Sequence, residues 1–249
     1  MEILNLIIVT SAGLLSGFYG TISGGGPLLI IPLLIFMGFP AQVAIATSRL
    51  GSLGIPVTGL YRYAKGGKVL YKLGLPLAFF ATIGSFIGAN LLVRLEEAFL
   101  QKIVAILLIS VALFLVFKRE IGLERKVSRT FEKKRILGYV SSFIVGLYAG
   151  FFGAGWATFF SYLLIFCFGL TFLESAGTRK MVGLPLSIIA TVVFIIYGRI
   201  EFLYGGILFA SQAVGSYFGA GFALKKGENF AKILFIIVAL ISGIKLLIG

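Results

Sequence analysis

Apolar residues occur in long runs along this chain, separated by short stretches that hold most of the glycine, proline and charged residues. Several runs reach or approach the roughly 20 apolar residues that a helix needs to cross a bilayer. The pattern therefore predicts an all-α polytopic membrane protein with five hydrophobic segments in each half. These segments are residues 3–22, 27–39, 44–61, 73–93 and 103–117, then 136–153, 156–170, 180–198, 202–224 and 232–248.

The two halves of the chain are related by an internal repeat. Thr82–Ala89 reads TIGSFIGA and Ala213–Ala220 reads AVGSYFGA, at an offset of 131 residues that Thr47 and Thr178 share. Internal repeats of this kind are typical of membrane transporters. We expect residues 1–117 to form a first membrane repeat, 118–135 a basic cytoplasmic linker, and 136–249 a second membrane repeat.

Two relative orientations of the repeats remain open. If segments 27–39 and 156–170 each reverse the chain, the basic loop at 62–72 and Lys225 lie on one side and Arg199 lies on the other. The repeats are then inverted, with broken or re-entrant helices at the glycine-rich motifs. If each short segment instead continues the span before it, the repeats are parallel. The inverted arrangement is favoured because segment 27–39 is too short to span a bilayer.

Composition and charge narrow the chemistry of the chain. Hydrophobic residues make up 59% and charged residues 12%, against about 45 to 50% and 25% in soluble domains. The net charge of +13 comes from short loops beside apolar runs, which indicates cytoplasmic loops facing anionic lipid rather than a nucleic-acid partner. The chain has no His, no Asp and a single cysteine, Cys167. Disulfides, Cys/His metal sites and the usual catalytic pairs are therefore excluded, and we expect no enzyme activity and no cofactor.

A glycine-rich tract interrupts the first apolar region at Gly24, Gly25, Gly26 and Pro27. A break at membrane depth leaves backbone groups that protein or water must satisfy. Pro27 suits the first turn of a helix, and the glycines before it leave N–H groups directed at whatever lies there. The partial positive charge of a helix N-terminus makes an anion the natural occupant.

The second half repeats this tract in a weaker form, as Gly153, Ala154 and Gly155 followed by Trp156. We expect the two tracts to meet near the membrane midplane and form one pocket, with Trp156 in its wall. The alternative is that the glycines only allow close helix packing. We prefer that alternative for two glycine pairs elsewhere, Gly13 with Gly17 and Gly84 with Gly88.

A second motif pairs hydroxyl groups with cations in both halves. Thr47, Ser48 and Arg49 correspond to Thr178, Arg179 and Lys180. Hydroxyls and a cation are the groups that bind an oxyanion, and a charge within an apolar segment is a functional candidate. The alternative is that the three cations are anchors that snorkel to the interface. The candidate binding residues are Gly24, Gly25, Gly26, Thr47, Ser48, Arg49, Gly153, Gly155, Trp156, Thr178 and Lys180.

The chain resembles the TauE/SafE family of membrane proteins, also called sulfite exporters. The likeness covers nearly the whole chain and rests on Gly13–Gly20 (GLLSGFYG), Gly24–Gly26, Ala46–Ser48 and Gly84–Ala89, with the same series in the second half. The resemblance implies a bacterial or archaeal inner-membrane carrier of small sulfur-containing anions such as sulfite, thiosulfate or sulfoacetate. The sequence departs from the family's GxGGG motif in both halves, with GTISGGG in the first and GAGWA in the second.

These features together predict an alternating-access transporter of a small anion, of the sulfur oxyanion or organosulfonate class. Its partners would be the anion, the lipid bilayer and a coupling proton or sodium ion, and it could form a homo-oligomer. Two other functions remain open. One is a passive anion channel lined by the same broken helices, and the other is a membrane scaffold or assembly protein that transports nothing.

Overall fold

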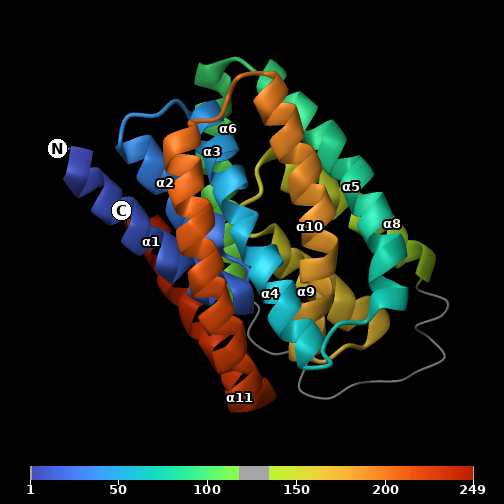
Figure 1. Cartoon of the computed structure of the whole chain (residues 1–249). Helices are drawn as coiled ribbons and strands as arrows, with labels where there is room; N and C mark the ends of the chain where they lie inside the picture. The colour runs from blue at the N-terminus through green and yellow to red at the C-terminus, as the bar shows by residue number, and fades with distance from the viewer. Residues whose placement is uncertain (1, 118–134, 249) are drawn as a thin grey trace.

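A computed structural model describes residues 2–117 and 135–248, with the side chains of 3–104, 106, 107, 110 and 136–226. The predicted linker lies almost entirely outside the described residues. Every regular element in these ranges is an α-helix (Figure 1). The helices are α1 (Glu2–Ile22), α2 (Gly26–Phe36), α3 (Ala41–Ser52), α4 (Gly54–Lys65), α5 (Tyr71–Arg94), α6 (Glu97–Phe117), α8 (Arg135–Phe151), α9 (Trp156–Phe168), α10 (Phe172–Ile196) and α11 (Phe202–Ile248).

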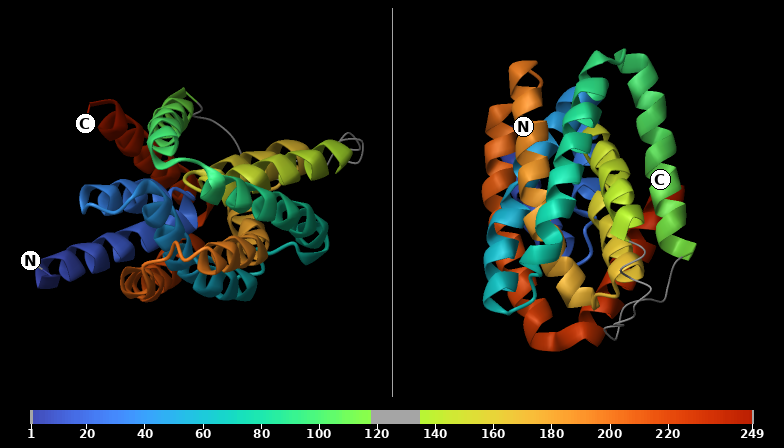
Figure 2. Two further views of the ribbon diagram at one scale, coloured as in Figure 1. Left: turned by 90° about the horizontal axis from the view of Figure 1, so that it is seen from above. Right: turned by 90° about the vertical axis from the view of Figure 1, so that its right-hand side faces the viewer.

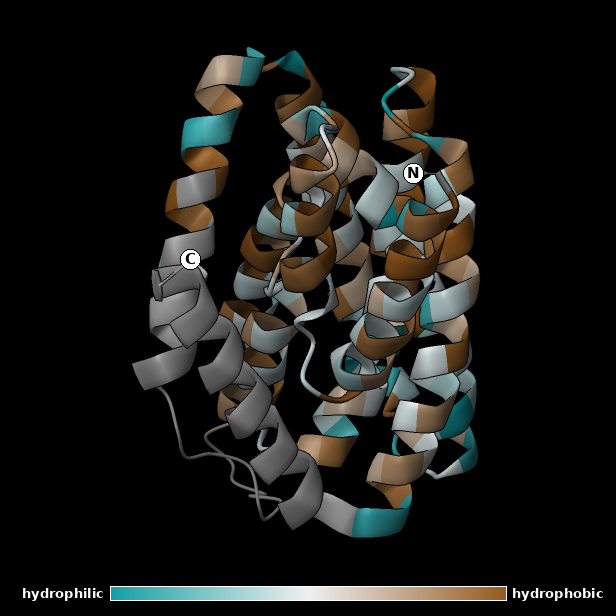
Figure 3. Ribbon diagram, turned by 90° about the vertical axis from the view of Figure 1, so that its left-hand side faces the viewer, coloured by the Kyte–Doolittle hydropathy of each residue, from teal (hydrophilic) through white to brown (hydrophobic). Residues whose placement is uncertain are grey.

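The helices have the length and the surface of a multi-pass membrane protein, which confirms that part of the predicted fold. Within the described residues, five stretches are long and apolar enough to cross a bilayer. Large apolar side chains point outward along them, with Ile3 75%, Phe79 64% and Phe218 63% exposed. Hydrophobic residues occupy long stretches of the helices in Figure 3. The five stretches are Ile3–Ile22, Ala41–Lys65, Tyr71–Arg94, Phe172–Ile196 and Phe202–Lys226.

The predicted segment at 44–61 is two helices rather than one. α3 ends at Ser52 and α4 begins at Gly54. Pro56 explains the break, because it has no N–H to donate to Ser52 and its ring would crowd the carbonyl of that residue.

The ninth and tenth predicted segments are joined instead, since α11 continues through 225–231. That stretch contains no proline and is rich in residues that favour helix.

Two pairs of helices turn back inside the molecule. α1 runs inward from the end where the chain begins, and α2 returns toward that end, whereas α8 and α9 enter and return at the opposite end (Figures 1 and 2). The turns between the paired helices lie at residues 23–25 and 152–155. Both turns are buried. Each short helix therefore starts inside the protein.

Helices from opposite halves of the chain pack against each other through glycine. α1 lies along α11, and α5 lies along α8. A Cβ at Gly17 would overlap the backbone of Gln212, and a Cβ at Gly88 would overlap the carbonyl of Leu147. Gly13 and Gly84 are equally close to the facing helix. This confirms the packing role predicted for Gly13, Gly17, Gly84 and Gly88.

Replacing Gly88 with alanine is expected to lower the stability of the protein. The new methyl group would force α5 away from α8, which costs about 1 to 3 kcal/mol and exceeds the helix propensity that alanine adds, about 1 kcal/mol at most. Thermal unfolding of the purified protein in detergent measures the change.

Gly206→Ala is the matched control for this substitution. Gly206 also lies within a long helix, but nothing lies within 4 Å of a Cβ built there. Gly206→Ala should therefore unfold at the same temperature as the wild type or above it. If both variants unfold at the wild-type temperature, the close approach of α5 and α8 is wrong.

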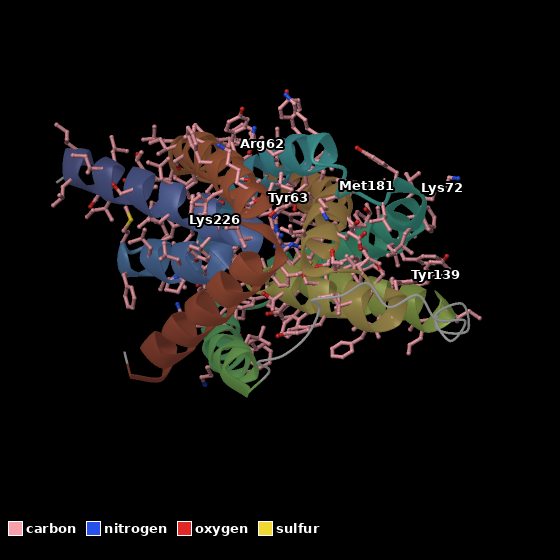
Figure 4. All side chains as sticks on the ribbon, turned by 90° about the horizontal axis from the view of Figure 1, so that it is seen from below. Arg62, Tyr63, Lys72, Tyr139, Met181 and Lys226 are labelled. Carbon is pink, nitrogen blue, oxygen red and sulfur yellow. The ribbon has the colours of Figure 1, made fainter. Side chains whose placement is uncertain are left out.

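Basic residues gather at one end of the molecule. Arg62, Lys72 and Lys226 lie around the end that Figure 4 shows, where α4 ends and α5 begins. Arg94 lies at the other end of α5, and Arg199 follows α10 at that same end (Figure 1). The two ends of α5 therefore lie in surroundings of different charge.

Candidate functional site

The turn between α1 and α2 is built on glycine. Gly24 has a φ of +93°, a conformation that glycine adopts without strain. A Cβ there would lie 2.7 Å from the Cβ of Ala157 and 2.8 Å from Nη1 of Arg179. The Tyr19 hydroxyl donates to the carbonyl of Gly25 at 3.0 Å. Gly25 caps α2 and Pro27 lies in its first turn. Pro27 has no N–H and the Leu28 N–H donates to Gly25 O at 3.0 Å, so the N–H of this turn without a partner in the helix is that of Gly26.

Arg179 of α10 holds this turn from the opposite half of the chain. Its side chain is 1% exposed, and its guanidinium donates five hydrogen bonds. Three of them go to the last carbonyls of α1 and the turn, because a helix C-terminus leaves its carbonyls without intrahelical donors. The acceptors are Thr21 O (3.0 Å), Ile22 O (2.6 Å), Ser23 O (3.2 Å), Ala157 O (3.0 Å) and Ser161 Oγ (2.7 Å).

Lys180 lies beside Arg179 but is held far more loosely. Its side chain is 4% exposed. Its ammonium group donates one long hydrogen bond, 3.4 Å, to the carbonyl of Gly20. Two cationic side chains therefore approach the same helix end, and among the described residues Lys180 has one hydrogen-bond acceptor where Arg179 has five.

A small cavity of about 30 Å³ lies where these groups meet. Both halves of the chain contribute to its wall, and none of the described residues that line it is acidic. All glutamates whose side chains are described are at least partly exposed, so the two cations face the cavity without a buried carboxylate beside them. The lining residues are Gly20, Gly24, Gly26, Pro27, Ser52, Ile55 and Pro56 from the first half, and Trp156, Ala157, Arg179, Lys180, Gly183 and Ser187 from the second.

The structure brings together only some of the predicted site residues. Gly24, Gly26, Trp156 and Lys180 line the cavity, and Gly25 lies behind it as the cap of α2. The other six are not among its lining residues. They are Thr47, Ser48, Arg49, Gly153, Gly155 and Thr178.

Arg49 of α3 reaches the second turn from the opposite half of the chain, as Arg179 reaches the first. Its guanidinium, 3% exposed, donates to the carbonyl of Ala149 near the end of α8 and lies against Gly153, whose φ is +80°. The Tyr148 hydroxyl donates to Ala154 O at 2.6 Å, as Tyr19 does in the first turn. Each half of the chain thus sends an arginine to the turn of the other half.

The interpretation of Arg49, Arg179 and Lys180 as interfacial anchors is wrong. All three side chains are at most 4% exposed. α3 begins at Ala41 and α10 at Phe172, earlier than the predicted segments 44–61 and 180–198. Arg179 and Lys180 therefore lie inside α10, and Arg49 lies in the last turn of α3, next to the start of α4.

Thr47 and Thr178 form a reciprocal pair of contacts between the halves. The Thr47 hydroxyl accepts a hydrogen bond from the backbone N–H of Glu201 at 3.0 Å, and the Thr178 hydroxyl accepts one from Leu70 at 3.1 Å. Leu70 and Glu201 directly precede α5 and α11. Each threonine thus binds the start of a long helix in the opposite half. The Ser48 hydroxyl is buried and has no hydrogen-bond partner among the described residues.

Sequence reasoning left out the most strongly bonded residue of the site, Arg179. One signal could have found it. When the two halves are aligned at the offset of 131 residues, Arg179 in the second half corresponds to Ser48 in the first. Gly183 and Ser52 have that same relation, and both line the cavity. Positions where the repeats differ thus carry part of the site.

Known proteins place the chain among membrane transporters. It is 29% identical over 236 residues to a probable membrane transporter protein, ORF9, of Sinorhizobium sp., covering 95% of this chain and 90% of that one. Similar matches are the probable membrane transporter proteins YfcA of Escherichia coli K12, 27% identical over 94% and 86% of the two chains, and YdhB of Bacillus subtilis 168, 26% identical over 97% and 98%. No solved structure matches. Residues 9–246 match the family described as sulfite exporter TauE/SafE, so the chain belongs to the TauE/SafE family of membrane transporters.

Proposed function

We propose that this protein is a carrier of a small oxyanion, which binds in the cavity between the α1–α2 turn and the first turn of α9. The observation that carries the proposal is the pair of buried cations, Arg179 and Lys180, at a cavity with no acidic lining residue. A buried charge without a partner is costly, and an anion in the cavity would supply that partner.

The backbone around the cavity favours the same occupant. α2 begins at Gly26, which lines the cavity, so the positive end of this helix points toward it. Lys180 has only the 3.4 Å bond to Gly20 O and retains donors for a ligand. In this proposal Arg179 holds the turn and Lys180 contacts the anion directly.

An inverted repeat would give the carrier its two conformations. α1 with α2 and α8 with α9 open toward opposite ends (Figure 1), as halves related by an axis in the membrane plane would. Arg179 makes five bonds to groups at the first turn, and Arg49 makes one at the second. Alternating access follows if the two arginines exchange roles. In the second conformation Arg49 would make the larger set of bonds at its turn, Arg179 would make fewer, and the cavity would open to the other side.

The sulfur-containing class of substrate is supported by the description of the family as sulfite exporters. Sulfite and thiosulfate are small anions with several acceptor oxygens, which suits a site made of an ammonium group and backbone N–H groups. We place the carrier in the inner membrane of a bacterium or archaeon, with the end that carries Arg62, Lys72 and Lys226 in the cytoplasm.

Replacing Gly24 with alanine is expected to reduce sulfite uptake about tenfold or more. The new methyl group would press on Ala157 and Arg179 at less than 3 Å and displace the turn, a loss worth about 1 to 3 kcal/mol. The measurement is uptake of radiolabelled sulfite and thiosulfate into proteoliposomes.

Gly38→Ala is the matched control for Gly24→Ala. Gly38 has nearly the same backbone, with a φ of +94°, and nothing lies within 4 Å of a Cβ there. Backbone strain is thus similar in the two variants, and only Gly24 touches the site. Equal uptake by both variants would contradict the assigned cavity. Saturable counterflow would support a carrier, whereas single-channel currents would establish a passive pore.

A further inference from the structure

Trp156 and Gly183 face each other across the cavity wall. Trp156 is the first residue of α9, and Gly183 lies on α10. A Cβ at Gly183 would lie 2.9 Å from Cη2 and 3.0 Å from Cζ2 of the indole. Both residues line the cavity. The indole therefore occupies the space that any side chain at position 183 would need.

The indole is held in this place. Its ring packs edge-on against Phe160 with the centroids 6.0 Å apart, and Trp156 is 9% exposed. Gly155, which precedes it, has a φ of +77° and caps the helix on which both aromatic residues lie. The wall at this point is thus an aromatic surface that Phe160 supports.

The cavity that this wall bounds is small. One water needs about 10 to 15 Å³ of such space, so about 30 Å³ holds a group the size of two or three waters. An oxyanion head group approaches this size. Trp156 has the bulkiest side chain of the lining residues, so a carbon chain that extends from the head group toward α9 would meet the indole.

We propose that Trp156, seated against Gly183, is a size filter that restricts the carrier to compact inorganic oxyanions and excludes sulfonates that carry a carbon chain. This inference rests on the proposed function and names its substrate class. The filter is a matter of shape alone, because indole and glycine add no charge to the site. Widening it should change which anion is carried without removing the groups that bind the head group.

The test uses sulfite with methanesulfonate, ethanesulfonate and propanesulfonate. The three sulfonates carry the same charge and add one carbon at a time, so differences among them report size. Each unlabelled anion competes with radiolabelled sulfite for uptake into proteoliposomes, and the strength of this competition measures how well the protein recognises that anion. A methylene that a pocket cannot hold reduces recognition about 10- to 200-fold, so wild-type recognition should fall by at least about tenfold from sulfite to ethanesulfonate. The ratio of ethanesulfonate to sulfite recognition should rise about tenfold or more in Trp156→Ala and by less in Trp156→Phe.

Two further variants sharpen the result. Gly183→Ala narrows the cavity and should lower the ratio of methanesulfonate to sulfite recognition. Phe166→Ala, a control on the same helix, removes an aromatic ring that is 45% exposed and lies outside the lining, so its ratios should match the wild type. The filter is overturned if the wild type takes propanesulfonate as readily as sulfite, or if neither Trp156 variant moves the ratio. A wild-type protein that carries none of these anions would instead overturn the proposed function.

Discussion

Arg179→Met is expected to reduce anion uptake by about 100-fold and to lower the unfolding temperature of the protein. Methionine cannot donate the bonds that now satisfy Thr21 O and Ile22 O, and each buried acceptor left without a donor costs about 1 to 3 kcal/mol. Two such losses are enough for a change of about 100-fold in the population of the intact site, since about 1.4 kcal/mol corresponds to a factor of ten. Sulfite uptake and thermal unfolding in detergent measure the two effects.

Arg199→Met serves as the control, because Arg199 is exposed and lies at an end of the molecule. Arg179→Lys should fall between the wild type and Arg179→Met, since an ammonium group has three donors and cannot span the acceptors that the planar guanidinium reaches. An Arg179→Met protein as stable as the wild type would show that the five bonds do not hold the turn.

Lys180→Met is expected to abolish sulfite uptake while leaving the protein at least as stable as before. The ammonium group makes only one long bond, so its removal leaves little unsatisfied. A buried charge without an ionic partner is costly, so replacing it with an apolar side chain of similar volume removes that cost. The substitution thus separates binding from folding, which Arg179→Met does not.

Two measurements check the role of Lys180. Sulfite should raise the unfolding temperature of the wild type, because a ligand that binds the folded state stabilises it, and it should have no such effect on Lys180→Met. Lys226→Met, at an exposed position, should behave as the wild type in both uptake and unfolding. Normal sulfite uptake by Lys180→Met would show that the anion binds elsewhere.

The helices and the glycine contacts could be predicted because they depend on local patterns. Runs of apolar residues marked the spans, and glycines four residues apart, such as Gly84 and Gly88, marked a face where another helix approaches closely. The break at Leu53 could also be predicted from the sequence, because Pro56 lies three residues further on. It was missed because the apolar run continues across it.

The contacts of Arg179 could not be predicted in the same way. Its acceptors at residues 21–23 lie more than 150 positions earlier, and a sequence does not show which helix end a guanidinium will reach. Thr47 and Thr178 illustrate the same limit. Their hydroxyls are suited to an anion, but in the structure they bind the backbone at Glu201 and Leu70. Which partner a polar group has depends on the tertiary fold.

The pairing of α1 with α11 fixes when this protein can finish folding during synthesis. The glycine face of α1 is complete once residue 22 is made, yet Gln212, which covers Gly17, follows about 190 residues later. At about 5 to 20 residues per second, α1 waits roughly 10 to 40 seconds in the membrane without its partner. The α1–α2 turn waits nearly as long for Arg179. The cavity can therefore be completed only after α10, which carries Arg179 and Ser187, has been made.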